Sequence, residues 1–382
     1  MIQTLRDADL DVLAQTLHSQ RARALDVVVQ ANQLRSSEGR LVLLGTEKTI
    51  TEDGVSDTDG CYLPTEVGDE GLASKLDIPL RYLRRLRAEH IPLLDANLNG
   101  WLLRDNRKFL VRVLRDESAG QDAASHGVVR AVLSDGYRCI DNLDVVLAAL
   151  AGVRGAGLGG LIVKADLTQR RMYVRVTSPA IAAQAVDLVR DYRDPLTGRR
   201  GPEYPLMFAG FVFSNSEVGE GAFNITPRVV LQVCTNGQTV TKDAMRKVHA
   251  GARLDEGVVE WSDETHRRNL DLITSQVTDA VRKFMSLSYV ESVVSDLCRQ
   301  AGIEVADPAS VVTNVSKRLG FTAEQQADIL NAFIRGGDAT TGGVMHAVTY
   351  VAQQQPSGDV AADMEDKALQ ALELAYLAAR PR

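Results

Sequence analysis

Residues 206–240 contain the feature that most restricts the fold, because two apolar segments there enclose a polar turn with glycines. Residues 206–213 are apolar and aromatic, and residues 222–233 combine alternation with a longer apolar run. Both patterns are typical of buried strands. Residues 214–221 have short polar side chains and two glycines, which favour a sharp turn whose amides and hydroxyls can face a ligand. We predict two neighbouring strands in the middle of a sheet; the alternative to a binding turn is a satisfied hairpin loop.

The rest of the chain surrounds this pair with further periodic segments. Residues 161–177 carry two β-rich runs around a polar centre and predict a hairpin. Apolar residues at helical spacing occur in residues 1–34, 69–94, 141–153, 262–298, 307–335, 344–355 and 359–379. We therefore expect an α+β fold with a central antiparallel sheet and packed helices, a small helical N-terminal region and a helical C-terminal region. The expected domains are 1–125, with a helix-turn-helix-like segment, then 126–300 and 301–382.

Composition limits the class of protein. A net charge of −7 disfavours a uniformly basic nucleic-acid binder, and an aromatic content of 5% leaves few base-stacking platforms. No apolar run approaches the roughly 20 residues of a membrane span, and residues 1–10 lack a signal-peptide core, so we expect a cytoplasmic protein without membrane contact. The four cysteines form no CxxC pair and the six histidines are scattered, so neither a metal site nor a cofactor is expected.

Positive charge nevertheless collects in the middle third of the sequence. It lies on the predicted hairpin, in a basic loop at residues 187–204 that we expect to be mobile, and in a patch at residues 242–253. Lysine and arginine beside phosphates release condensed counterions, so these residues are candidates for a polyanion groove. The candidate nucleic-acid contacts are Arg170, Arg171, Arg175, Arg190, Arg193, Arg199, Arg200, Lys242, Arg246 and Lys247. The alternative is a set of unrelated solvated faces, which spacing alone does not distinguish from a groove.

Two N-terminal segments suggest other partners. Residues 69–94 resemble a helix-turn-helix, in which the arginines at 81, 84, 85 and 87 would face outward and contact phosphates. A solvated face on a structural helical hairpin explains the same pattern. Residues 52–70 are acidic with glycine and threonine, which predicts an exposed loop that could mimic nucleic acid and block a host factor.

Catalysis has the least support in the sequence. Glu217 and Glu220 lie in the polar turn and could bind a divalent ion with Asp135, Asp141 or Asp144. Two carboxylates three residues apart are common on any protein surface, however. We therefore expect a protein that is not an enzyme.

Several separate motifs together carry a family resemblance. They are LDIPLRYLRRL at 76–86, VLSDGYRCIDNLDVV at 132–146, FSNSEVGEGAFNITPRV at 213–229 and VCTNG at 233–237. With these motifs the chain resembles the phage- and plasmid-borne proteins grouped as domain-of-unknown-function family 932. The turn residues of the resemblance are Asn215, Ser216, Glu217, Gly219, Asn236 and Gly237. This family resemblance implies a role in phage or plasmid DNA metabolism in the cytoplasm of a bacterial host.

The order of elements across residues 128–290 is also similar to that of strand-annealing proteins of the Rad-fifty-two superfamily. Those proteins form rings and hold single-stranded DNA in a basic groove. Our leading hypothesis is accordingly a homo-oligomeric protein that binds single-stranded DNA and promotes strand annealing or recombination, which needs neither metal nor nucleophile. The alternatives are a sequence-specific regulator of duplex DNA and an interaction protein that blocks a host factor.

Overall fold

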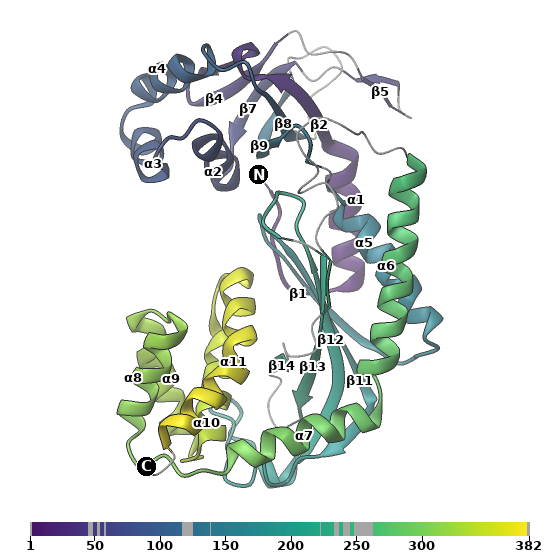
Figure 1. Ribbon diagram of the computed structural model, residues 1–382, viewed down its shortest axis with the longest axis vertical. Helices are drawn as coiled ribbons and strands as arrows, with labels where there is room; N and C mark the ends of the chain where they lie inside the picture. Colours follow the sequence, from purple (N-terminus) through teal and green to yellow (C-terminus); the bar gives the residue numbers. More distant parts are fainter. Residues whose placement is uncertain are drawn as a thin grey trace.

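The computed structural model describes residues 2–44, 49–51, 54–56, 59–116, 125–137, 139–221, 223–232, 237–239, 245–247 and 263–379. In this part of the chain, a six-stranded N-terminal sheet and a seven-stranded central sheet are followed by a bundle of C-terminal helices. Figure 1 shows the N-terminal sheet and the C-terminal helices at opposite ends of the molecule, with the central sheet between them. A separate pair of strands, β5 (Thr49–Thr51) and β6 (Gly54–Ser56), forms a small hairpin.

The N-terminal sheet has the strand order β2-β8-β9-β7-β4-β3. Its strands are β2 (Ala24–Gln30), β3 (Leu34–Ser37), β4 (Arg40–Leu43), β7 (Gly60–Pro64), β8 (Lys108–Arg115) and β9 (Ser125–Ser134), with a 3-10 turn η1 (Ala31–Gln33) after β2. Three helices pack against it: α2 (Glu66–Lys75), α3 (Leu80–Glu89) and α4 (Ile91–Leu102). They bury leucines such as Leu72 and Leu98 with Val111 of β8 in a separate core. This core makes the region a folding unit of its own, because apolar burial supplies most of the stabilising free energy.

The central sheet has the order β1-β10-β11-β12-β13-β14, and β15 also pairs with β13. Its strands are β1 (Leu5–Asp9), β10 (Ile162–Leu167), β11 (Met172–Gln184), β12 (Leu206–Asn215), β13 (Phe223–Leu231), β14 (Gly237–Thr239) and β15 (Met245–Lys247). The described strands of this sheet pair in antiparallel fashion, and Phe213 of β12 lies between Val174 and Ile225. A 3-10 turn η2 (Gly201–Glu203) precedes β12.

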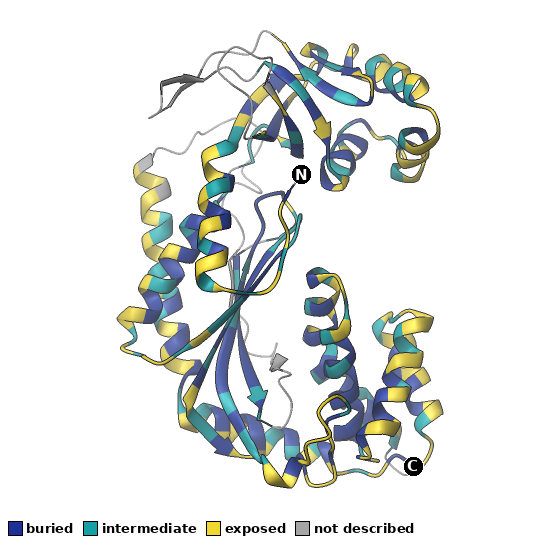
Figure 2. Cartoon of the chain, turned by 180° about the vertical axis from the view of Figure 1, so that it is seen from behind, coloured by how far each residue is buried: buried dark blue, intermediate teal, exposed yellow. Residues whose placement is uncertain are grey.

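The two faces of the central sheet differ because side chains alternate along each strand. One face carries buried apolar residues, among them Val174, Phe213 and Ile225. It is covered by α1 (Leu10–Arg23), α5 (Asn142–Gly155), α6 (Asp263–Phe284) and α7 (Leu287–Ala301). Figure 2 shows the central strands mostly buried and the outer sides of these helices exposed. The other face carries Arg175, Ser214, Thr226 and further polar residues, which line a pocket.

The C-terminal helices are α8 (Pro308–Leu319), α9 (Ala323–Gly336), α10 (Thr341–Gln354) and α11 (Gly358–Ala379). Their ends follow local sequence signals. Thr322 and Gln325 form a reciprocal capping box at the start of α9, and Gly337 ends that helix in the left-handed conformation. In the view of Figure 1, α11 stands beside the polar face of the central sheet.

The expected α+β class is confirmed, with its central antiparallel sheet, its N-terminal helices and its helical C-terminal region. The hairpin, the polar turn between β12 and β13, and the helices after residue 307 lie where the sequence predicts them. The long helix expected within residues 262–298 is α6, and α7 follows it. Two local expectations are wrong. Residues 1–34 contain strands on both sides of α1, and part of the acidic segment 52–70 forms β7 inside a sheet and the start of α2. Burial in long-range sheets outweighs the local signals there.

Candidate nucleic-acid interface

The predicted basic residues do not form one groove. Arg170, Arg171 and Arg175 lie at one end of β11, and the loop 187–204 follows its other end. Because β11 pairs along ten residues of β12 at about 3.3 Å each, the two ends of β11 are roughly 30 Å apart. The backbone of β15 places Arg246 opposite Asn224 and Lys247 opposite Phe223, while Lys242 lies outside the described residues.

Carboxylates neutralise two of the three hairpin arginines. Arg170 pairs with Glu70 at 2.6 Å and with Glu220 at 2.9 Å. Arg175 pairs with Asp166 at 2.6 Å. Burial alone raises the pKa of Asp166, but the Arg175 guanidinium outweighs burial and the net pKa is lower than usual. These ion pairs stabilise the sheet and leave Arg170 and Arg175 little free charge for phosphates.

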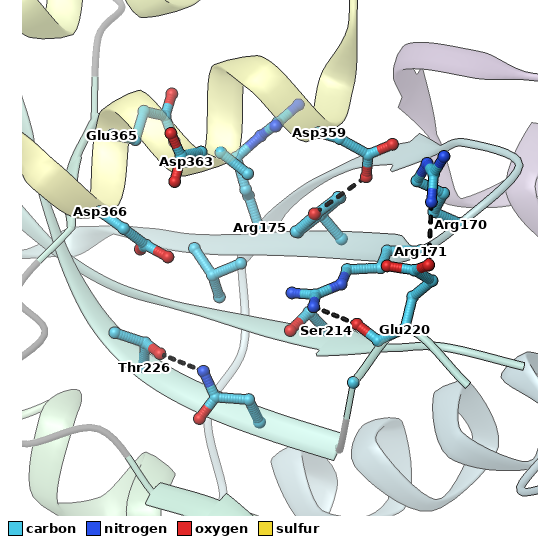
Figure 3. A pocket seen from close by; sticks show the side chains of 15 residues that line it. Arg170, Arg171, Arg175, Ser214, Glu220, Thr226, Asp359, Asp363, Glu365 and Asp366 are labelled. Carbon is cyan, nitrogen blue, oxygen red and sulfur yellow. Dashed lines mark hydrogen bonds and ion pairs between the residues drawn. The ribbon is translucent and has the colours of Figure 1, made fainter. Parts of the chain in front are cut away.

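Arg171 differs from its two neighbours. Its guanidinium donates to the carbonyl oxygen of Glu220, and the structure shows it in no ion pair with a described carboxylate. It lines a pocket of about 490 Å³ between the polar face of the sheet and α11, which we call the sheet–helix pocket. Figure 3 shows arginines entering this pocket from the sheet side and carboxylates from α11.

A second pocket, of about 380 Å³, lies at the other end of β11. We call it the arginine-loop pocket. Arg190, Arg193 and Arg200 of the loop border it, and α9 adds Arg335, which the sequence analysis did not identify. Arg190 pairs with Asp187, and Asp191 also borders the pocket. In the described part of the chain no carboxylate forms an ion pair with the other three arginines, and all three are exposed.

The arginine loop is held in shape by hydrogen bonds. Asp194 accepts from the amides of Leu196 and Thr197 at 2.9 and 2.7 Å, which closes a tight turn. An antiparallel bridge pairs Arg193 with Arg200, so their side chains leave the same side of the loop. Arg199 instead lies over the Tyr204 ring, with 4.9 Å between its guanidinium carbon and the ring centroid. The fold therefore presents Arg193 and Arg200 together.

A buried histidine attaches this loop to the C-terminal helices. The Nε2 atom of His346 in α10 lies 3.2 Å from the carbonyl oxygen of Leu188, and the centroid of its ring is 4.5 Å from the centroid of the Tyr192 ring. Burial lowers the pKa of His346 below its ordinary value, although nearby Asp338 opposes this shift. The neutral imidazole is thus the form that fits the fold.

We expect acid to weaken this attachment. Since the folded pKa is lower than the unfolded pKa of about 6.5, the unfolded chain binds more protons below that pH, and stability falls as the pH decreases from about 7 toward the folded pKa. Thermal unfolding of the wild type and of His346→Gln, measured at a series of pH values from about 7 downward, tests this loss of stability. The stability difference between the two proteins should shrink at the acid end. A difference that is independent of pH would contradict this expectation.

The polar turn between β12 and β13 has a structural role, because the side chains of residues 215–218 are buried. Asn215 donates to the carbonyl oxygen of Ile140 at 2.8 Å, and Ser216 donates to that of Arg170 at 2.8 Å. Glu217 accepts from Arg130 of β9 and from the Asn142 amide, both at 2.6 Å. Gly219 has a positive φ of 83° and lies against Leu133. The turn therefore joins the central sheet to the N-terminal sheet. Asn236 lies outside the described residues, and Gly237 begins β14.

Glu217 belongs to a buried ionic cluster at this joint. Arg112 of β8 pairs with Asp26 at 2.7 Å and with Asp141 at 3.0 Å, and its guanidinium also reaches Cys139. Burial raises the pKa of the Cys139 thiol well above its usual range. Burial also favours the neutral form of Glu217, but Arg130 and Arg112 outweigh it, so the pKa of Glu217 is lower than usual.

A polar cavity of about 240 Å³ adjoins the cluster. Neither Arg112 nor Arg130 was expected from the sequence to pair with Glu217. The signal that could have found them is a single arginine within the apolar runs FLVRVL and VVRAVL, because a charge inside a buried strand requires a partner.

Three of the four arginines in the helix-turn-helix-like segment are also engaged, while Arg81 is exposed. Arg87 points inward, contrary to the sequence-based expectation, and forms two hydrogen bonds to the buried Asp69 at 2.5 and 2.6 Å. Arg84 pairs with Glu70, and Arg85 pairs with Glu89 on its own helix. Burial raises the pKa of Asp69 despite the two arginines beside it. The segment therefore serves largely to hold α3 against α2.

Glu217 and Glu220, the two turn carboxylates considered for divalent-ion binding, do not converge. Glu217 faces Arg130, whereas Glu220 faces Arg170. Asp141 lies near Glu217, but the Arg112 guanidinium lies beside both carboxylates. Within the described ranges, no group of three or more His, Cys, Asp or Glu side chains is placed to hold a metal ion. None of the helices in the described part of the chain is long and apolar enough to span a membrane. No protein-family model, curated protein or solved structure matches the chain.

Proposed function

We propose that this protein binds the phosphate backbone of single-stranded DNA through the arginine-loop pocket. The observation that carries this proposal is the convergence of Arg193, Arg200 and Arg335 around one pocket without ion pairs to described carboxylates. Guanidinium groups form paired hydrogen bonds with phosphate oxygens, and exposed unpaired arginines lose little when they do so. The whole chain has a net charge of −7, so this group of positive charges belongs to an acidic protein.

The composition of the pocket favours phosphate contact over base recognition. Leu196 and Ile334 are exposed nearby at 70% and 65%, and among the described residues that line the pocket only the buried Tyr192 has an aromatic ring. Such a surface binds the phosphate backbone and leaves the base edges available for pairing. Strand annealing requires this combination. Binding should therefore depend weakly on sequence and strongly on salt.

The test is a fluorescence anisotropy titration of a labelled oligothymidylate against the wild type and the double variant Arg193→Gln, Arg200→Gln. We expect the double variant to lose about a tenfold factor in affinity at low salt. The slope of log K against log salt concentration should also be smaller by about 1.4, because each single-strand phosphate contact contributes about 0.7 to this slope. The control replaces Arg154 and Arg318 with glutamine, since both are exposed arginines far along the chain from the loop and the net charge matches. Equal losses in the two double variants, or no salt dependence, would refute the proposal.

Annealing activity, homo-oligomer or ring formation, a cytoplasmic phage or plasmid setting and relationship to family 932 are further parts of the same proposal. Mass photometry with and without single-stranded DNA tests the assembly state. The duplex-regulator alternative has less support, because Arg84, Arg85 and Arg87 are paired with carboxylates. Competition by duplex of one particular sequence over single strands would favour that alternative instead.

A further inference from the structure

The sheet–helix pocket has walls of opposite charge (Figure 3). Arg170, Arg171 and Arg175 line it from the sheet. On the other wall α11 contributes four carboxylates, which are those of Asp359, Asp363, Glu365 and Asp366. Its volume of about 490 Å³ is in the range of small-ligand sites. Opposite charges normally neutralise each other by close contact, so the distances across the pocket decide what it can bind.

The two walls make few close contacts. The nearest approach of an α11 carboxylate to an arginine of the sheet is 3.9 Å, between Glu365 and Arg228. Asp363 pairs with Lys367 of its own helix at 2.6 Å. Asp366 forms no ion pair with a described residue, and desolvation, with Glu365 and Asp363 nearby, raises its pKa to about 7. Asp366 is therefore partly protonated at neutral pH, and the negative charge that the helix presents to the pocket comes mainly from Asp359, Asp363 and Glu365.

The sheet presents incompletely compensated positive charge in return. Arg171 lacks an ion pair with any described carboxylate, whereas Arg170 and Arg175 have theirs. Arg228 lies on the same face of the sheet, is 6% exposed, and has an Nε with no hydrogen-bond partner in the described structure. A phosphate group in the pocket would accept hydrogen bonds directly from the Arg171 guanidinium. The carboxylates of α11 do not accept such hydrogen bonds from Arg171 in the described structure.

We propose that the sheet–helix pocket binds a phosphate group of single-stranded DNA at Arg171, and that the carboxylates of α11 weaken this binding in the free protein. The identity of the polyanion rests on the proposed function. The pocket is a second contact, at the opposite end of β11 from the arginine loop. Its carboxylates set the affinity because an anion that enters must approach Asp363, Glu365 and Asp366.

The experiment neutralises the inner side of α11. In the triple variant Asp363→Asn, Glu365→Gln, Asp366→Asn, the affinity for labelled oligothymidylate should rise roughly tenfold at low salt, and the gain should shrink at high salt. The control triple, Glu324→Gln, Asp328→Asn, Glu373→Gln, changes net charge equally at exposed positions away from the pocket. Adding Arg171→Gln to the inner triple should remove most of the gain. Thermal unfolding shows whether each variant is folded, and Asp366→Asn alone, assayed above pH 7 where Asp366 is mostly ionised, provides a milder test.

Each outcome is decisive. An equal gain in the control triple would show that net charge alone acts, and a gain that survives Arg171→Gln would place the contact elsewhere; either result overturns the inference. The inference is also overturned if the triple variant of Asp363, Glu365 and Asp366 shows no gain in oligonucleotide affinity. If that variant does not fold, the same holds for Asp366→Asn alone. The proposed function fails separately, if the wild type binds no oligonucleotide or if Arg193 and Arg200 do not contribute.

Discussion

Replacement of Glu217 with glutamine is expected to lower the free energy of unfolding by about 3–5 kcal/mol, the range for breaking a buried ion pair. The change leaves Arg130 buried without its counterion, and Arg112 loses the nearby charge as well. Glutamine retains an oxygen for the Asn142 amide, so the loss is mainly electrostatic. Urea denaturation followed by far-ultraviolet circular dichroism measures it.

The same carboxylate provides a pH test. Because the folded pKa of Glu217 is below its unfolded value of about 4.3, its contribution to stability is present above that pH and is lost as the pH falls through the folded pKa. The difference between wild type and Glu217→Gln should therefore decrease in acid. Glu220→Gln is the matched control: its carboxylate is 38% exposed and Arg170 keeps Glu70, so we expect a loss below about 1 kcal/mol. Similar losses for both variants would contradict the assigned role of the turn.

Replacement of Gly201 with alanine is expected to disrupt the arginine loop. A Cβ at this position would lie 1.9 Å from the carbonyl oxygen of Val189 and 2.7 Å from its Cβ. The backbone cannot move away freely, because the Gly201 amide donates to the carbonyl oxygen of Tyr192 at 2.8 Å. Such overpacking typically costs about 1–3 kcal/mol, and occasionally more. Since Arg200 is the adjacent residue, oligonucleotide affinity should fall about as far as in the Arg193 and Arg200 double variant.

The control for Gly201→Ala is Gly159→Ala, where nothing lies within 4 Å of the added Cβ and φ is not positive. That substitution should leave stability and binding unchanged within about 0.5 kcal/mol. Urea denaturation and the anisotropy titration give the two measurements on each protein. If Gly201→Ala binds oligonucleotide like the wild type, the loop conformation is not needed for phosphate contact and the proposed function loses its structural basis.

Local patterns predicted much of the fold. The capping box at Thr322, the hairpin before Met172 and the polar turn after Asn215 all depend on residues within a few positions of one another. The N-terminal sheet did not follow from such patterns. Its β7 pairs in parallel with β9, joining Gly60 to Ser125, and nothing in an acidic stretch identifies the middle strand of a sheet.

The candidate site was predicted only in part, because the availability of a charge depends on its partners. The sequence identified Arg193 and Arg200 as candidates, together with Arg170 and Arg175, which the fold pairs with carboxylates. It did not identify Arg335, which reaches the loop across 140 positions to donate to the Pro195 carbonyl oxygen.

By itself, the sequence determined the strand pair, the polar turn and the middle-third concentration of arginine, since periodicity and composition are local properties. Only the tertiary structure decided what each of these does. It buried Glu217 between two arginines as a joint between sheets, and left Arg193, Arg200 and Arg335 unpaired with described carboxylates around a pocket. The physical reason is that burial and ion pairing are set by neighbours distant in the chain, and these neighbours determine whether a charge stabilises the fold or remains available for a ligand.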